Sequence, residues 1–298
     1  MSFSYNVKAE LCRAAVQRLC CARAEAYGVL LYCNTFTPTE VRIITGNPAY
    51  AERLPRLFGK AFRIHFDRVP EETQGGKFIL QITDAAKITH IINTLGYDPA
   101  THLVHHINFG LLEDDCCRAS FVRGAFLAGG SVTDPTKRYH LELTTSHHQA
   151  SREMAALLTD MGYFPKSVTR QGSSITYFKQ SEHIEDLLTH IGAPVAAMDI
   201  MSAKVEKNLR NSVNRRVNCD AANLDKAIEA SQEQVEAIRR LMETGRIDSL
   251  GEKIRQTAQA RLENPELTLS ELAANFDPPI TKSCLNHRMR KIMELARE

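Results

Sequence analysis

The residues best suited to chemistry lie near the C-terminus, in the segment TKSCLNHRMRKI, residues 281–292. It carries Lys282, Arg288, Arg290 and Lys291 and no acid. Asn and Arg side chains pair with adenine and guanine edges respectively, and Lys also pairs with guanine. We therefore assign these residues to DNA contact: Lys282, Ser283, Asn286, His287, Arg288, Arg290 and Lys291. The alternative is a solvated helix face, and His287 taken alone is more typical of a surface histidine.

A second basic stretch, KVEKNLRNSVNRR, covers residues 204–216 and has five basic residues and one acid, Glu206. Arg215 and Arg216 at its end suit a phosphate backbone. The net charge of the whole chain is only +2, so the distribution of charge carries this prediction. A solvated helix face is again the alternative.

Eight cysteines include two adjacent pairs, Cys20-Cys21 and Cys116-Cys117, and no CxxC spacing. Adjacent side chains on a helix diverge by about 100°, which is poor geometry for holding one metal ion. We therefore expect reduced thiols that pack as small apolar side chains, with no metal site and no cofactor.

The DNA-contact residues require a helix that presents them. The preceding segment TLSELAANF opens with Thr268 and Glu271, the spacing of a capping box at a helix start. The segment DPPIT then interrupts the helix because it contains two prolines. In a second helix over 282–296, four apolar residues at helical spacing should face inward: Leu285, Met289, Ile292 and Ala296. A short helix, a turn and a longer basic helix predict a helix-turn-helix, with an ordinary helical hairpin as the alternative.

Further helices are expected upstream of this motif. Residues 217–227 indicate a connector that leads into a helix over 227–242. That helix should bury an apolar stripe formed by Ile228, Val235, Ile238 and Leu241. Another helix is predicted over 250–262, ended by Asn264-Pro265.

The first two hundred residues contain one order of elements twice. In the first copy we expect helices over 24–32, 49–58 and 85–95 and strands over 40–45, 62–69 and 77–83. In the second copy we expect helices over 121–128, 149–161 and 182–191 and strands over 138–145, 166–170 and 174–179. Gly28 and Gly124 hold equivalent places, 96 residues apart. A duplicated α/β unit explains this order, and chance similarity of two α+β segments is the alternative.

The segment FVRGAFLAGGSV, residues 121–132, resembles the LAGLIDADG motif of homing endonucleases. Small residues are needed where two such motif helices cross, which places Gly28 and Gly124 at the crossing. In that family the last acid of each motif binds a divalent metal ion at the scissile phosphate. The matching positions are Cys33 and Gly129, which offer no hard oxygen ligand. The resemblance thus implies a vestigial site without catalysis, and a metal-dependent site-specific endonuclease is the alternative.

Four separated segments together resemble the WhiA regulators of Gram-positive bacteria: MSFSYNVKAEL, RGAFLAGGSVTDP, NSVNRRVNCDAAN and PPITKSCLNHRMRKI. This resemblance implies a degenerate LAGLIDADG domain joined to a helix-turn-helix. It also implies a non-enzymatic DNA-binding regulator that acts in transcription, cell division, chromosome segregation or sporulation.

The expected fold class is therefore α+β, with a duplicated LAGLIDADG-type repeat followed by an all-α helix-turn-helix domain. The expected divisions are 1–110 and 111–202 for the two repeats, 203–225 for a basic linker and 226–298 for the helix-turn-helix domain. Double-stranded DNA is the expected partner, and a docking role for the first domain toward other regulatory proteins is the alternative. No apolar run suggests a membrane span or a signal peptide, so we expect a cytoplasmic, nucleoid-associated protein.

Overall fold

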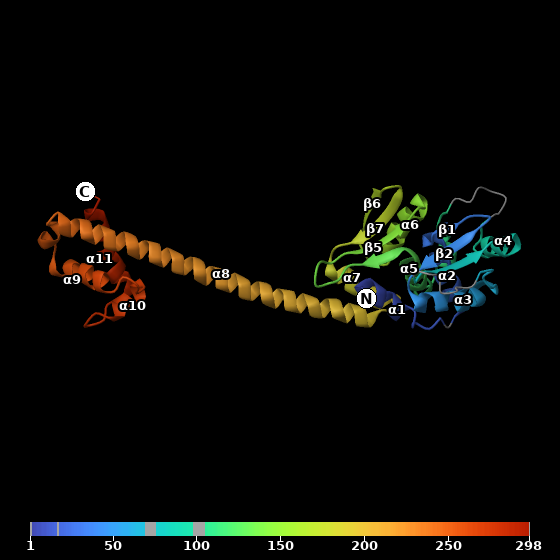
Figure 1. Ribbon diagram of the computed structural model, residues 1–298, viewed down its shortest axis with the longest axis horizontal. Coiled ribbons are helices and arrows are strands. Elements are labelled where there is room, and N and C mark those ends of the chain that lie inside the picture. The colour runs from blue at the N-terminus through green and yellow to red at the C-terminus, as the bar shows by residue number, and fades with distance from the viewer. Residues whose placement is uncertain (1, 17, 69–75, 98–104, 298) are drawn as a thin grey trace. The chain divides into compact units, whose positions relative to one another are not determined.

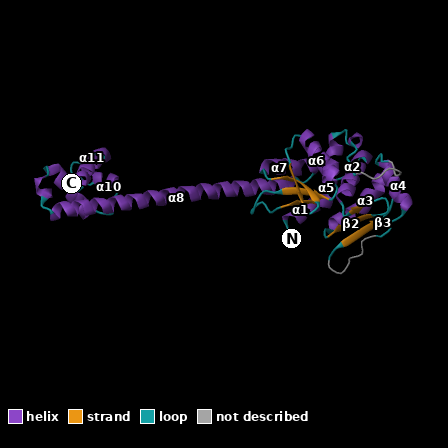
Figure 2. Cartoon of the chain, turned by 90° about the horizontal axis from the view of Figure 1, so that it is seen from above, coloured by secondary structure: helices purple, strands orange, loops and turns teal. Residues whose placement is uncertain are grey.

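The computed structural model describes residues 2–16, 18–68, 76–97 and 105–297 (Figure 1). The chain divides into two compact units, Met1–Lys207 and Asn208–Glu298. Within the described residues, all strands belong to the first unit, and the second consists of helices and loops (Figure 2). The α+β class predicted from the sequence is confirmed.

Two helices form the centre of the first unit: α2 (Leu19–Tyr32) and α5 (Asp115–Gly129). Most residues of both helices are buried, 11 of 14 in α2 and 10 of 15 in α5, because both are apolar around most of their circumference. Helix α1 (Phe3–Leu11) packs against α5. Helix α5 ends at Gly129, one residue beyond the end predicted from the sequence, and Gly130 is its C-cap.

The close approach of α2 and α5 depends on two glycines. A Cβ atom on Gly28 would overlap the carbonyl oxygen of Phe121 and lie 2.8 Å from the amide nitrogen of Ala125. A Cβ on Gly124 would overlap the carbonyl oxygen of Glu25 and lie 3.1 Å from the amide nitrogen of Val29. Each glycine therefore contacts the backbone of the opposite helix, and the predicted placement of both at the crossing is confirmed.

The first repeat builds a three-stranded antiparallel sheet in the order β1-β2-β3 beside its helices. Its elements are β1 (Thr35–Phe36), β2 (Val41–Thr45), α3 (Pro48–Phe62), β3 (Phe78–Ile82) and α4 (Ala85–Thr94). The strand expected over 62–69 is wrong for its described residues: α3 continues through Phe62, and only Arg68 forms an isolated bridge, to Gln81. Arg63 ends α3 in the left-handed region at φ 59°, so the chain turns there instead of extending. The sequence Gln74-Gly75-Gly76 between the strands expected over 62–69 and 77–83 also predicts a turn, but Gln74 and Gly75 lie outside the described residues.

The second repeat has a four-stranded antiparallel sheet in the order β4-β5-β7-β6. Its elements are β4 (Gly130–Val132), β5 (Leu141–Thr145), α6 (His148–Asp160), β6 (Lys166–Arg170), β7 (Ser173–Phe178) and α7 (Ser181–Ile191). A short 3-10 helix, Phe109–Leu111, precedes α5. Alternate residues of β5 and β7 are buried, which gives each strand one core face. All elements expected from the second copy are present, but α5 begins six residues before the helix expected over 121–128. The other ends lie within three residues of the predicted ones.

The second unit begins within α8 (Pro194–Glu243) and continues through the 3-10 helix Arg246–Ser249, α9 (Glu252–Glu263), α10 (Leu269–Ala274) and α11 (Lys282–Leu295). Residues 217–227, expected as a connector, are helical within α8. No glycine or proline occurs between Val195 and Thr244, so nothing in the sequence interrupts the helix there. Of the predicted apolar stripe, Ile238 and Leu241 are buried, whereas Ile228 is exposed. None of the helices in the described part of the chain is both long and apolar enough to cross a membrane.

Candidate nucleic-acid interface

Two small cores hold the helices of the second unit together. One is formed by Ile238, Leu241, Ala258, Met289 and Ile292, from α8, α9 and α11. The other joins α10 to α11 through Leu272, Ala273 and Leu285. The inward positions predicted for Leu285, Met289 and Ile292 are therefore confirmed, and Ala296 packs against the same core while partly exposed.

Side chains fix the starts of both helices of the motif. Thr268 Oγ1 accepts a hydrogen bond from the Glu271 amide at 3.3 Å, and Glu271 Oε2 accepts one from the Thr268 amide at 2.9 Å. This is the predicted capping box. Thr281 caps α11 in a similar way, since its Oγ1 accepts from the Cys284 amide at 3.2 Å. The turn between α10 and α11 thus ends at a defined residue.

A buried arginine positions the chain that leads into α10. Arg261, near the end of α9, is 1% exposed. Its Nη1 donates to the carbonyl oxygens of Leu267 at 2.6 Å and Asn264 at 3.3 Å. Burial lowers the pKa of its guanidinium from the ordinary value. Sequence reasoning missed this residue, because an arginine on a helix gives no local sign that it will be buried.

The predicted DNA-contact residues lie on one helix, α11. Its residues Lys282, Ser283, Asn286, His287, Arg290 and Lys291 are exposed, and Arg288 is half-buried. Asn286 and Arg290 are four residues apart and therefore share a face. Arg215 and Arg216 are also exposed, on α8. The surface of α11 opposite its core is thus polar and basic.

The two positions predicted to be vestigial endonuclease sites, Cys33 and Gly129, lie at the C-terminal ends of α2 and α5. Cys33 follows α2, and its thiol donates to the carbonyl oxygens of Leu30 and Thr35, both at 3.2 Å. Burial raises the pKa of this thiol to about 12, so it is neutral near pH 7. At Gly129 an added Cβ would overlap the carbonyl oxygen of Thr144. Neither position offers an oxygen ligand, and the second has no room for a side chain.

A buried carboxylate connects the two repeats. Glu25 of α2 is 0% exposed and accepts hydrogen bonds from Arg53 Nε at 2.6 Å and Arg123 Nε at 2.9 Å. Arg53 belongs to α3, and Arg123 is the arginine of the second motif helix. Sequence analysis did not identify this triad, because its members are far apart in the chain.

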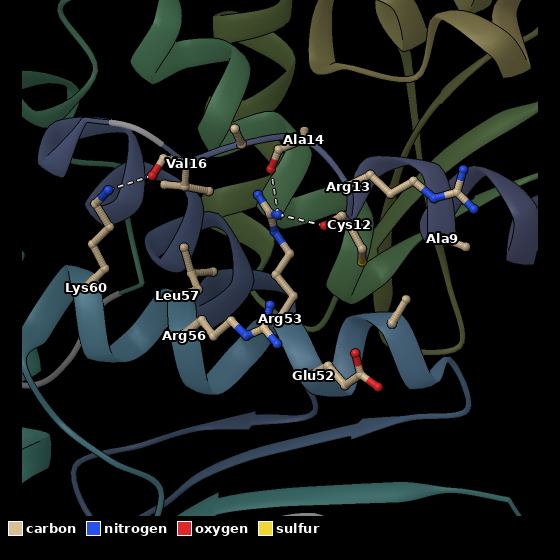
Figure 3. Close-up of a pocket in the computed structure, with 12 residues that line it drawn as sticks. Ala9, Cys12, Arg13, Ala14, Val16, Glu52, Arg53, Arg56, Leu57 and Lys60 are labelled. Atoms are coloured by element: carbon tan, nitrogen blue, oxygen red, sulfur yellow. Dashed lines mark hydrogen bonds between the residues drawn. The ribbon is translucent and has the colours of Figure 1, made fainter.

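A pocket of about 470 Å³ lies beside this triad, between residues 9–16 and α3 (Figure 3). Arg53 Nη1 donates to the carbonyl oxygens of Cys12 at 2.9 Å and Ala14 at 2.7 Å, and Lys60 Nζ donates to that of Val16 at 2.6 Å. These cations therefore hold the segment after α1 against α3.

The fold and these positions define a class of protein: a LAGLIDADG-like domain without acids at the motif ends, followed by a helix-turn-helix domain. Family models for this class match residues 118–210, as the WhiA LAGLIDADG-like domain, and residues 213–296, as the WhiA C-terminal helix-turn-helix domain.

The chain belongs to the WhiA family. It is 35% identical over 309 residues to the probable cell division protein WhiA of Alkaliphilus metalliredigens, across 99% of this chain and 98% of the relative. It is 34% identical over 315 residues to that of Clostridium acetobutylicum, across 100% and 98%. A crystal structure of full-length WhiA from Thermatoga maritima has the same fold, with a TM-score of 0.61 and 23% identity over 100% of this chain and 98% of that one. The family predicted from four sequence segments is confirmed.

Proposed function

We propose that this protein is a non-enzymatic regulator that binds double-stranded DNA and reads its sequence with α11. The observation that carries the proposal is the exposed polar face of α11, held on two cores and begun by a capped turn. A helix presented in this way can enter the major groove with the residues near its N-terminus closest to the bases. The named relatives support a role in cell division, and we extend it to transcription control, chromosome segregation or sporulation.

Within α11 we assign two kinds of contact. Asn286 and Arg290 form bidentate hydrogen bonds with base edges, because an amide matches adenine and a guanidinium matches guanine. Lys282, Ser283 and His287 contact bases or nearby phosphates from the same exposed face. Arg288 and Lys291 contact phosphates.

Arg215 and Arg216 on α8 are assigned to the phosphate backbone. Phosphate contacts carry no sequence information by themselves but release counterions, so they contribute affinity that falls with salt.

Loss of cleavage activity is the second part of the proposal. Two-metal phosphodiester hydrolysis needs hard oxygen ligands at both motif ends. The neutral thiol of Cys33 and the crowded Cα of Gly129 do not supply them. We propose that the LAGLIDADG-like domain acts instead as a second DNA surface or as a docking platform, and that the protein is cytoplasmic and associates with the nucleoid.

The first experiment selects binding sites for the full chain from a pool of random DNA duplexes. We expect enrichment of a defined sequence, and the selected duplex should bind at least about tenfold more tightly than a scrambled one. A pool that remains random after repeated selection, with binding that is merely salt-dependent, would contradict sequence reading.

A second experiment incubates pure full-length protein with supercoiled plasmid carrying the selected site, in Mg²⁺ and in Mn²⁺. We expect no nicked or linear product. Nicking that purifies with the protein and is lost in an Asp134→Asn variant would support the endonuclease alternative, because Asp134 lies close to the motif in the sequence.

A third experiment tests the role of the first domain. Residues 1–207, used as bait with and without nuclease treatment, distinguish proteins captured directly from those captured through DNA.

A further inference from the structure

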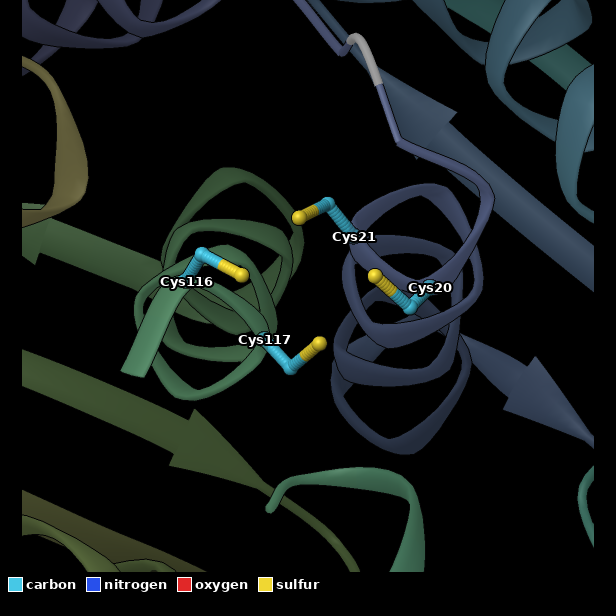
Figure 4. A group of neighbouring side chains, drawn as sticks. All are labelled: Cys20, Cys21, Cys116 and Cys117. Carbon is cyan, nitrogen blue, oxygen red and sulfur yellow. The ribbon is translucent and has the colours of Figure 1, made fainter. Parts of the chain in front are cut away.

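Four cysteines meet between the first turns of α2 and α5 (Figure 4). Cys20 and Cys21 come from α2, and Cys116 and Cys117 come from α5. Their four sulfur atoms all lie within 4.8 Å of one another. The two pairs are equivalent in the duplication, since each is separated from its counterpart by the same 96 residues as Gly28 and Gly124.

This arrangement changes what the adjacent cysteines can do. Two neighbouring side chains of one helix diverge, so one pair alone cannot surround an ion. Here the crossing of α2 and α5 places two diverging pairs opposite each other, and each pair can occupy one edge of a tetrahedron. Figure 4 shows the four thiols directed into the space between the two helices.

The spacing fits a single ion. Zinc bound by four thiolates has Zn–S distances of about 2.3 Å, which for a tetrahedron corresponds to sulfurs roughly 3.8 Å apart. The observed limit of 4.8 Å requires only a small contraction of side chains. A four-iron cluster would need the sulfurs to move apart, because the iron and sulfide atoms lie between them.

The electrostatic surroundings suit a group of negative charge. A zinc ion with four thiolates carries a net charge of −2. Each cysteine pair lies in the first turn of its helix, where the free amides provide partial positive charge. Arg18 Nη1 lies 3.3 Å from Cys116 Sγ and 3.8 Å from Asp114 Oδ2, so its positive charge is shared between the thiol group and this carboxylate. Cys21 and Cys117 are buried, and Cys20 and Cys116 are half-buried.

We propose that Cys20, Cys21, Cys116 and Cys117 bind one Zn²⁺ as a structural site that ties the two repeats together. Binding releases the four thiol protons to solvent, since the thiolates are the ligands. The site lies at the N-terminal ends of α2 and α5, whereas Cys33 and Gly129 lie at their C-terminal ends. It is therefore separate from the vestigial endonuclease positions, and it does not depend on the proposed DNA binding.

The test uses the full chain, purified under reducing conditions without chelator. We expect one zinc ion per chain by elemental analysis. After zinc is replaced by Co²⁺, the visible bands of a tetrahedral ion and the ultraviolet bands of thiolate ligation should appear together. Removing the metal with a chelator should lower the melting temperature of the first unit, followed by tyrosine fluorescence, because all eight tyrosines precede residue 208.

Matched variants identify the ligands. Cys20→Ser/Cys117→Ser removes one thiol from each helix, and we expect loss of zinc and of the Co²⁺ bands. Cys219→Ser/Cys284→Ser changes two exposed cysteines, and this variant should retain both the bound zinc and the Co²⁺ bands. If the first variant fails to fold, the Co²⁺ spectrum of the unmodified chain still tests the proposal, because it reports thiolate ligation directly.

Several results would overturn the proposal: a chain that binds no Zn²⁺ or Co²⁺ and has four freely reactive thiols, disulfides between the helices under reducing conditions, or the absorption of an iron–sulfur cluster. Equal metal content in both double variants would also overturn it.

Discussion

At the level of single residues, Glu25 is unusual because one buried carboxylate neutralises two arginines. Its carboxylate is fully buried and is shared by two arginines from different elements, Arg53 and Arg123. Arg123 also donates to the carbonyl oxygen of Ile191 at 3.0 Å and to Ser120 Oγ at 3.0 Å. Every nitrogen of the two guanidinium groups therefore donates at least one hydrogen bond, and both groups share the single negative charge of Glu25.

Replacing Glu25 by Gln should leave both guanidinium groups without their counter-charge. Removing one partner of a buried ion pair typically costs about 3–5 kcal/mol. We expect the free energy of unfolding of the first unit to fall by that order, measured by urea titration with tyrosine fluorescence. Glu52→Gln, on the exposed side of α3, is the control and should change little. Equal stability of the two variants would mean that the triad contributes no more than a surface charge.

The vestigial positions give a second prediction. The double substitution Cys33→Asp/Gly129→Asp places an acid at the end of each motif helix, but we expect no metal-dependent cleavage of plasmid. An aspartate at 129 would drive its Cβ into the carbonyl oxygen of Thr144, so the ends of α5 and β5 must separate. Gly129→Ala isolates this steric effect and should destabilise the first unit by itself, by about 1–3 kcal/mol or more. A stable double variant that cleaves DNA in Mg²⁺ would show that the ancestral geometry survives.

At the scale of elements, the crossing of α2 and α5 is the main structural constraint. Gly124→Ala inserts one methyl group against the backbone of Glu25 and Val29. Overpacking of a rigid core typically costs about 1–3 kcal/mol, and contact with backbone leaves little relaxation. We expect the free energy of unfolding of the first unit, measured by urea titration with tyrosine fluorescence, to fall by at least that amount.

The control for this substitution is Gly46→Ala in the loop after β2. There the added Cβ would meet only the carbonyl oxygen of Gly76, at an ordinary 3.7 Å. If Gly124→Ala lowers the free energy of unfolding no more than Gly46→Ala does, the close crossing of α2 and α5 is contradicted.

Elements with local signals were predictable from the sequence. The capping box of Thr268 and Glu271, the alternation in β5 and the apolar spacing in α11 each report on nearby residues. The strand expected over 62–69 is absent from the described residues, because α3 extends to Phe62 and the chain turns at Arg63. The connector expected at 217–227 was also wrong, because this segment contains no glycine or proline and continues α8 without interruption.

Sites formed by residues distant in sequence were the least predictable. The Glu25 triad and the four cysteines depend on how α2 and α5 cross, and neither helix alone indicates its partner. Each adjacent cysteine pair diverges on its own helix, and only the crossing of α2 and α5 brings the two pairs together.

At the scale of the whole molecule, the two units have separate cores and separate assigned roles. We expect residues 204–298 alone to bind the selected duplex with an affinity close to that of the full chain and to lose affinity steeply as salt rises. Residues 1–207 alone should bind much more weakly. The measurement is a fluorescence-anisotropy titration of each fragment at several salt concentrations. If residues 1–207 bind as well as the full chain, the main DNA-binding surface lies in the LAGLIDADG-like domain.

Matched variants can distinguish the side chains proposed to contact bases from α11 from those proposed to contact phosphates. Asn286→Ala and Arg290→Ala should each lose about 1–3 kcal/mol of preference for the selected duplex over a scrambled one. Arg215→Ala and Arg216→Ala should weaken binding to both duplexes alike and reduce the salt dependence.

These comparisons require folded protein. Asn286 is exposed, so Asn286→Ala should leave the melting temperature of the second unit nearly unchanged. Leu285→Ala removes a buried side chain and should destabilise that unit by about 2–5 kcal/mol. The Leu285→Ala variant therefore serves as a control that shows how much binding is lost through unfolding alone.

The most direct measurement is therefore the binding of folded Asn286→Ala and Arg290→Ala proteins to the selected and scrambled duplexes over a salt series. We predict that affinity falls chiefly for the selected duplex, with little change for the scrambled one. Equal losses on both duplexes would contradict sequence reading by α11.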